Sequence, residues 1–183
     1  MALYHHNAGV VLRSLGRFNE ALEHLQNAIH LKADYADAYN ELGLLYQQLH
    51  RPDEALAASQ QALSISPAKA EYHRRIASAY SGLGQVEMTL AELRLSVEMQ
   101  PDSADAHKEL GLSLELSGQY EAALAEYQKA STIDPNNPDY LCNIGSALRQ
   151  QERYNEALTY LKNAIELAPL DIIAHHQLGL VLT

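Results

Sequence analysis

The sequence has little of what secreted, membrane-spanning or nucleic-acid-binding proteins require. A single cysteine, Cys142, excludes an internal disulfide and is typical of a reducing compartment. No apolar run approaches the roughly 18 residues that cross a bilayer, and the N-terminus lacks the basic start and apolar core of a secretory signal. Lys and Arg number 13 against 23 Asp and Glu, a formal net charge of −10, whereas binding a phosphate backbone needs a cationic face. We therefore expect a cytoplasmic protein that binds neither nucleic acid nor a membrane.

Catalytic and metal-binding motifs are missing as well. The sequence has no Gly-x-Ser-x-Gly, no His-Glu-x-x-His and no Cys-x-x-Cys, and Gly82-Leu-Gly84 is half of a dinucleotide fingerprint with no strand before it. Four of the nine histidines recur at multiples of 34 residues: His5, His73, His107 and His175. Imidazoles one repeat apart lie roughly 10 Å or more from one another, too far to share a zinc ion with bonds of about 2.0–2.1 Å. We predict packing histidines, no metal, no cofactor and no enzyme activity.

What the sequence does have is a period of 34 residues. Four prolines follow it: Pro67, Pro101, Pro135 and Pro169. Glycine follows it too, with alanine in one place: Gly9, Gly43, Ala77, Gly111, Gly145 and Gly179. Alanine recurs at the same interval in two further series, one from Ala21 and one from Ala28. A fixed period of this length is typical of a stack of similar supersecondary units.

Each period is predicted to hold two amphipathic helices. In residues 38–49 apolar side chains recur at spacings of three and four, which places them on one helix face. Pro52 then begins a second helix, where its missing N–H costs nothing, and Pro67 ends it. Three turns between the helices carry glycine, which tolerates positive φ: Gly16, Gly84 and Gly118. Polar residues that can cap a helix directly precede the first helix of three units: Ser103, Asn137 and Asp171.

Small, apolar and proline residues in fixed slots of a 34-residue unit resemble the tetratricopeptide repeat (TPR). The resemblance covers essentially the whole chain, with repeats at 2–35, 36–69, 70–103, 104–137 and 138–171 and a partial repeat at 172–183. It implies an all-α fold, a right-handed α-solenoid superhelix of antiparallel helix pairs, formed by one array over residues 1–183. First helices would line an inner groove and second helices the outer surface.

The resemblance implies a binding function. We expect a non-catalytic scaffold that holds a peptide or helix of a partner protein in its concave groove. By resemblance, nine residues in groove-facing slots are candidate contacts: Asn7, Asn40, Leu44, Arg74, Arg75, Lys108, Leu112, Asn143 and Arg149. Three of them predict a basic patch for an acidic side chain or a C-terminus: Arg74, Arg75 and Lys108. The alternative is that these cations pair with acidic neighbours: Glu71, Asp105 and Glu109.

Two other functions are kept as alternatives. The chain is somewhat similar to the TPR superhelix of O-GlcNAc transferases, whose asparagine ladder it keeps at Asn7 and Asn143, so it could be the substrate-presenting arm of a larger enzyme such as a glycosyltransferase. It could also be a self-assembling array, because apolar residues crowd residues 172–183 with no second helix to cover them. A chaperone tail is not expected as the ligand, since His6 and Val10 stand where TPR clamps for such tails have lysine and asparagine.

Overall fold

The computed structural model describes residues 1–182, and every regular element in that range is an α-helix. The chain divides into two compact units, the first at Met1–Met99 and the second from Gln100 onward. The first unit contains α1 (Ala2–Ser14), α2 (Phe18–Leu31), α3 (Ala36–Gln48), α4 (Pro52–Ile65), α5 (Ala70–Gly82) and α6 (Val86–Met99). The second unit contains α7 (Ala104–Leu116), α8 (Tyr120–Ile133), α9 (Pro138–Gln150), α10 (Tyr154–Leu167) and α11 (Ile172–Leu182).

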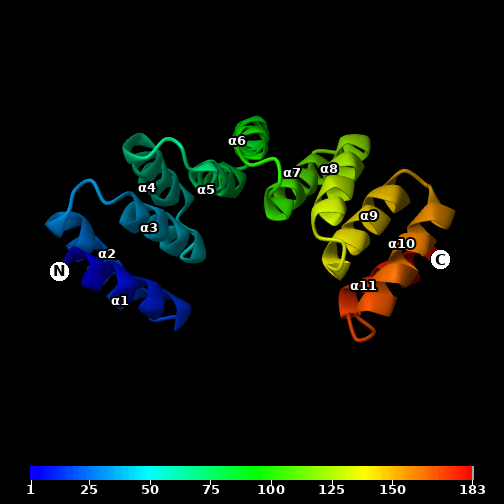
Figure 1. The fold of residues 1–183 in the computed structure, drawn as a ribbon, viewed down its shortest axis with the longest axis horizontal. Coiled ribbons are helices and arrows are strands. Elements are labelled where there is room, and N and C mark those ends of the chain that lie inside the picture. Colours follow the sequence, from blue (N-terminus) through cyan, green and yellow to red (C-terminus); the bar gives the residue numbers. More distant parts are fainter. Residues whose placement is uncertain (183) are drawn as a thin grey trace. The chain divides into compact units, whose positions relative to one another are not determined.

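The first unit is built from antiparallel helix pairs. α1 packs against α2, α3 against α4 and α5 against α6 (Figure 1), and within the unit α2 also contacts α3 and α4 contacts α5. The first helices touch in series, α1 on α3 and α3 on α5. Between the first two pairs lies a core in which Leu25 and Leu45 are fully buried. The predicted all-α architecture of helix pairs is confirmed.

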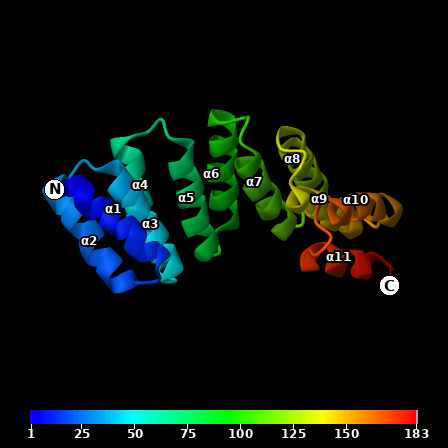
Figure 2. The same ribbon diagram turned by 60° about the horizontal axis from the view of Figure 1, so that its bottom comes forward.

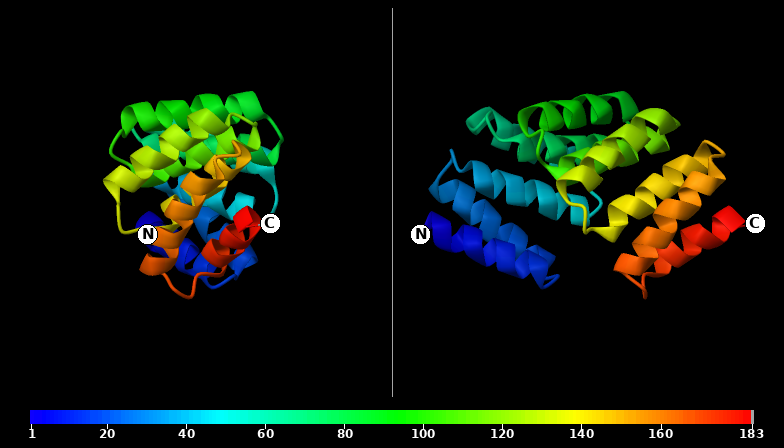
Figure 3. Two further views of the ribbon diagram at one scale, coloured as in Figure 1. Left: turned by 90° about the vertical axis from the view of Figure 1, so that its right-hand side faces the viewer. Right: turned by 45° about the vertical axis from the view of Figure 1, so that its right-hand side comes forward.

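The second unit repeats this arrangement. α7 pairs with α8 and α9 with α10, while α11 packs against both α9 and α10, as Figure 2 and the right-hand view of Figure 3 show. Three first helices, α7, α9 and α11, are therefore in contact in series along one side of the unit. This row of first helices carries the candidate site.

Small residues allow the two helices of a pair to approach closely, as the repeated glycine and alanine slots predict. A Cβ added to Gly111 would lie 2.5 Å from Cε1 of Tyr127, and one added to Gly145 would lie 2.6 Å from Cγ of Leu161. Ala123 is fully buried in the facing helix. Glycine is required in these two places because any side chain would collide with the partner helix.

The turns inside the pairs need a left-handed residue. Gly16, Gly84 and Gly118 have φ values of 73°, 71° and 78°, as predicted for glycine at a helix C-terminus. The two remaining turns place His50 and Glu152 in the same region, with φ values of 56° and 59°. An L residue in this conformation costs roughly 1–2 kcal/mol relative to the right-handed region.

Side-chain caps occur on the first helices of the second unit. The oxygens of Ser103, Asn137 and Asp171 accept hydrogen bonds from backbone N–H groups of Ala106, Asp139 and Ile173, at 3.3, 3.1 and 2.9 Å. These three predicted caps are confirmed. In the first unit, the residues before α3 and α5, Tyr35 and Lys69, make no such bond.

Candidate functional site

The first helices of the second unit border a cavity of about 550 Å³. Its walls come from α7, α9 and α11, and the start of α8 contributes one side chain. We call this cavity the groove. It is lined by Leu112, Glu115, Leu116, Tyr120, Cys142, Asn143, Ser146, Gln150, Ile173 and Gln177.

Three primary amides line the groove: Asn143, Gln150 and Gln177. Oε1 of Gln177 is buried and has no hydrogen-bond partner within residues 1–182. A buried polar atom without a partner costs free energy that a ligand donor can recover. Because an amide both donates and accepts, these side chains can bind the backbone of an extended segment.

Glu115 lies among these amides with its carboxylate fixed at both oxygens. The hydroxyl of Tyr127 donates to Oε2 at 2.8 Å, and the hydroxyl of Ser146 donates to Oε1 at 2.7 Å. Burial and the neighbouring charge of Glu115 raise the pKa of Tyr127 well above its ordinary range, so the phenol stays protonated and keeps donating. The network ties α8 and α9 to a carboxylate on α7.

Exposed apolar side chains stand beside the polar ones. Leu112 is 40% exposed, Leu116 is 86% exposed and Ile173 is 62% exposed. Clustered apolar side chains that water can reach are typical of a surface that contacts a partner. The groove therefore combines an apolar rim with amides and one fixed carboxylate.

Cys142 is part of the groove wall but is not a reactive thiol. It is buried, and its Sγ lies 3.9 Å from Oδ2 of Asp171. Burial and the charge of Asp171 raise the pKa of Cys142 to about 11. The thiol is therefore neutral near pH 7, whereas a nucleophilic cysteine needs a lowered pKa.

In the first unit, polar side chains of neighbouring first helices form hydrogen bonds and an ion pair with one another. Nε of Arg13 lies 3.0 Å from Oε2 of Glu41, and the amide of Asn40 donates to Oε1 of Glu71 at 3.1 Å. The amide of Gln47 donates to the backbone carbonyl of Arg75 at 3.1 Å. Each contact joins neighbouring first helices. Oδ1 of Asn40 is buried and has no hydrogen-bond partner among the described residues, so the pairing is complete for some of these polar groups and partial for Asn40.

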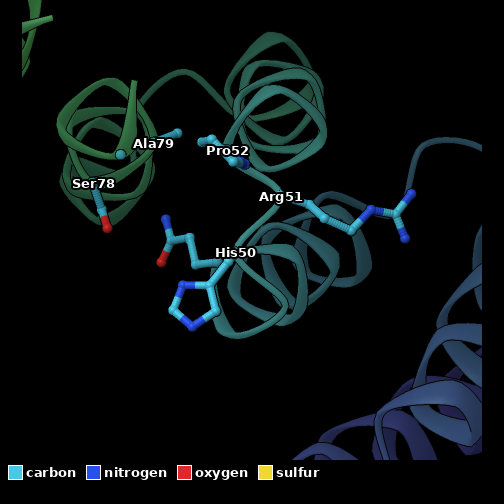
Figure 4. Close-up of a pocket in the computed structure, with 7 residues that line it drawn as sticks. His50, Arg51, Pro52, Ser78 and Ala79 are labelled. Carbon is cyan, nitrogen blue, oxygen red and sulfur yellow. The ribbon is translucent and has the colours of Figure 1, made fainter. Parts of the chain in front are cut away.

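A smaller cavity of about 270 Å³ lies between α5 and the turn that joins α3 to α4. Figure 4 shows His50 and Pro52 on one side of it and Ser78 and Ala79 on the other, with the side chain of Arg51 pointing away. Arg51 instead pairs with Glu54 and lies over the ring of Tyr46. The cavity is half the volume of the groove in the second unit.

The sequence-predicted contacts fall on the first helices, but the structure places them differently. Leu112 and Asn143 both line the groove. Asn40 is only 6% exposed, which leaves little of it for a partner. Leu44 is half-buried, and Asn7 is exposed on α1. Their role in binding stays a prediction.

The basic candidates make local ion pairs, as the pairing alternative predicts. Arg75 lies 3.3 Å from Glu71, and Lys108 lies 3.6 Å from Asp105. Arg74 is half-buried on α5. Two of the candidates belong to the first unit and Lys108 to the second. A shared patch for an acidic ligand stays a prediction.

Arg149, the last candidate, lies in the final turn of α9. Its Nε is buried without a hydrogen-bond partner in the described part of the chain. Of the ten residues that line the groove, the candidates chosen from the sequence include two, Leu112 and Asn143. The groove residues that were not chosen are Glu115, Leu116, Tyr120, Cys142, Ser146, Gln150, Ile173 and Gln177. Leu116 and Ile173 occupy slots that the TPR resemblance assigns to the groove, so the slot itself was the available signal. Tyr120 starts a second helix, which carries no such signal.

Two of the four recurring histidines, His73 and His107, bridge helices, whereas His175 is exposed and its Nε2 lies 2.9 Å from the carbonyl oxygen of Pro169. Nδ1 of His73 lies 2.7 Å from Oε2 of Glu92. Nδ1 of the buried His107 lies 2.6 Å from Oε2 of Glu126, and its Nε2 lies 2.9 Å from the carbonyl oxygen of Pro101. The packing role predicted for this slot is confirmed at both positions. Within residues 1–182, no three His, Cys, Asp or Glu side chains are grouped so that they could hold a metal ion.

Within residues 1–182, no helix has the length and apolar character needed to cross a bilayer.

Comparisons with known proteins agree with the architecture. A family model described as TPR repeat matches residues 9–49 and 116–148. Models described as tetratricopeptide repeat match residues 34–100 and 138–170. A search of the curated proteins found no match.

Solved structures with the same fold have low sequence identity to the chain. YrrB, described as a TPR protein with an unusual peptide-binding site, is 24% identical with a TM-score of 0.75, over 96% of this chain and 91% of YrrB. TTC0263, a TPR protein of Thermus thermophilus, is 22% identical with a TM-score of 0.78, over 100% and 99%. MamA from Desulfovibrio magneticus RS-1 is 20% identical with a TM-score of 0.81, over 93% and 97%. With its repeated helix pairs and the matching family models, the chain belongs to the tetratricopeptide repeat family.

Proposed function

We propose that the chain is a protein-interaction module that binds an extended segment of a partner in the groove formed by α7, α9 and α11. The observation that carries the proposal is the group of three amides, one of them with a buried oxygen that lacks a partner within residues 1–182, around a cavity of about 550 Å³. Hydrogen bonds to a partner's backbone would satisfy the amides, and apolar side chains of the partner would cover Leu112 and Leu116.

A structural neighbour supports a peptide as the ligand. YrrB shares the fold and is described as having a peptide-binding site. The amides of Asn143 and Gln177 come from consecutive first helices, α9 and α11. A segment lying across these helices would meet polar groups in succession, as an extended backbone requires.

The groove is suited to binding rather than to chemistry. Glu115 is held at both oxygens by hydroxyl donors, so it is not placed as a general base. Cys142 is a buried, protonated thiol. We therefore propose a non-catalytic scaffold.

The test is selection of peptides from a random library displayed on phage, followed by calorimetry on the best binders. Leu112→Arg places a charged chain on the rim and should weaken binding about tenfold or more. Leu95→Arg is the matched control, because Leu95 is similarly exposed, at 42%, but lies on α6. Failure to enrich any peptide, or equal binding by Leu112→Arg and the unmodified chain, would contradict the proposal.

Self-association is a second candidate, favoured by the exposed apolar side chains of the last turn and helix. Leu170 is 93% exposed, Ile172 is 82% exposed and Leu182 is 68% exposed. Size exclusion with light scattering across a wide concentration range should then show a mass that climbs above 20.3 kDa, and Ile172→Asp should reverse the increase. A constant mass of one chain would dismiss this candidate.

A further inference from the structure

We infer that the groove of the second unit selects a segment with a basic side chain between apolar residues, and that its ammonium or guanidinium group binds Glu115. This inference rests on the proposed function and adds the chemistry of the partner. It differs from the acidic ligand that the basic candidates of the sequence predict.

Glu115 differs from other half-buried glutamates in the groups that surround its carboxylate. Three other half-buried glutamates each have a basic partner: Glu41 with Arg13 at 3.0 Å, Glu92 with His73 at 2.7 Å and Glu126 with Lys129 at 2.8 Å. Glu115 has two hydroxyl donors instead. These donors fix the carboxylate, and among residues 1–182 no cationic side chain is paired with it. A half-buried charge without a counter-ion is a strong attractor for a cation, because the local dielectric is lower than that of water.

The unit that contains the groove carries a net negative charge. The sequence from residue 100 onward has five Lys and Arg against twelve Asp and Glu, a formal charge of −7, while residues 1–99 have eight against eleven, a charge of −3. A second carboxylate, that of Asp171, lies 3.9 Å from Sγ of Cys142, which lines the groove. Lys108 is paired with Asp105, and Arg149 is not among the described residues that line the groove. The field at the groove therefore favours a cationic ligand.

Apolar side chains line the groove together with the carboxylate of Glu115. Leu112 and Leu116 lie on α7 with Glu115, and Ile173 faces the cavity from α11. A long basic side chain can lay its methylene stem along these apolar groups and place its charged end at the carboxylate. Apolar neighbours in the segment would then cover the rest of the rim. The ligand is thus a peptide rather than a free amine, because the amides still require a backbone.

The experiment compares peptides selected by the unmodified chain and by Glu115→Gln. The substitution keeps the size of the side chain and removes its charge. Glu166→Gln is the matched control, since Glu166 is exposed on α10 and the net charge changes equally. Lys and Arg should be enriched next to apolar positions on the unmodified chain and on Glu166→Gln, and this enrichment should vanish on Glu115→Gln.

A double-mutant cycle on one selected peptide gives the second readout. Exchanging its basic residue for Met should weaken binding to the unmodified chain about tenfold or more and should leave binding to Glu115→Gln unchanged. Affinity for the basic peptide should also fall as ionic strength rises. This last measurement uses the unmodified chain, so it stands even if Glu115→Gln does not fold.

The outcomes separate this inference from the proposed function. Enrichment of acidic or purely apolar peptides, or a basic preference that persists in Glu115→Gln, would overturn the inference and leave groove binding in place. If no peptide is enriched on any of the three proteins, both are wrong.

Discussion

In the first unit, polar side chains of neighbouring first helices bind one another, whereas in the second unit several of them face a groove. Asn40 of α3 is buried and bonded to Glu71 of α5, while Asn143 of α9 lines the cavity. The two asparagines stand one slot apart in their repeats, the fifth and the sixth. The same residue type therefore joins two helices in one unit and lines a cavity in the other.

Two sets of residues in the repeat have different roles. Glycine, alanine and leucine in the recurring slots set how closely the helices pack, and they do so alike in both units. Residues in the variable slots decide which polar side chains of the first helices pair with one another and which line a cavity.

The largest effect should come from a shared leucine slot and should be the same in both units. Leu90 is 1% exposed and Leu124 is 4% exposed. Replacing either with Ala should leave a cavity and lower the free energy of unfolding by about 2–5 kcal/mol. Urea unfolding followed by circular dichroism measures it. A large loss in one unit and none in the other would break the claim of a common scaffold.

The next effect should come from the glycine beneath Tyr127. Gly111→Ala places a methyl group 2.5 Å from the tyrosine ring and should cost about 1–3 kcal/mol of stability through overpacking. Gly179→Ala is the matched control, because no atom lies within 4 Å of its added Cβ, and it should stabilise its helix by up to about 1 kcal/mol. Urea unfolding of both variants, followed by circular dichroism, measures the difference. Similar changes at both positions would show that the close approach is not what requires glycine.

A smaller effect should follow from the caps of the second unit. Asn137→Ala removes the acceptor for the backbone N–H of Asp139 and should cost about 1 kcal/mol. Asn136→Ala, at an exposed neighbouring position, should change stability by less than about 0.5 kcal/mol. Thermal melts of the two variants measure the difference. Equal stability of the two variants would show that the Asn137 cap does not stabilise the second unit, and capping would then not distinguish the two units.

The smallest effect should be a gain in stability at the two turns without glycine. His50→Gly in the first unit and Glu152→Gly in the second relieve positive φ worth roughly 1–2 kcal/mol. Glycine has greater conformational freedom in the unfolded chain, which lowers the free energy of unfolding by about 0.5–1 kcal/mol. Each variant should therefore gain about 0.5–1 kcal/mol in its free energy of unfolding. Urea midpoints measure the gain. A loss at either turn would indicate that the side chain makes a stabilising contact there.

The recurring residues of the sequence were enough to predict the helices, because period and spacing act locally. Ser103 as a cap and Gly84 as a turn residue follow from the chemistry of a helix end. His107 as a packing residue followed from its slot. The predicted partner-binding set was less complete, although Leu112 and Asn143 both line the groove.

The sequence could not predict which side chains from different helices contact one another. Asn40 and Asn143 are the same residue type in adjacent slots, and only the packed structure shows that one is buried against Glu71. The fixed carboxylate of Glu115 depends on hydroxyls from α8 and α9 at once. Such contacts join separate helices, so no local pattern records them.

The most direct test of the contrast between the two units is an NMR titration that follows the side-chain amides. A peptide selected on the unmodified chain is added, and the ¹H–¹⁵N signals of Asn143, Gln150 and Gln177 are compared with those of Asn40 and Gln47. The account predicts shifts at the three groove amides and unchanged signals at the two amides of the first unit. Shifts confined to Asn40 and Gln47 would contradict it.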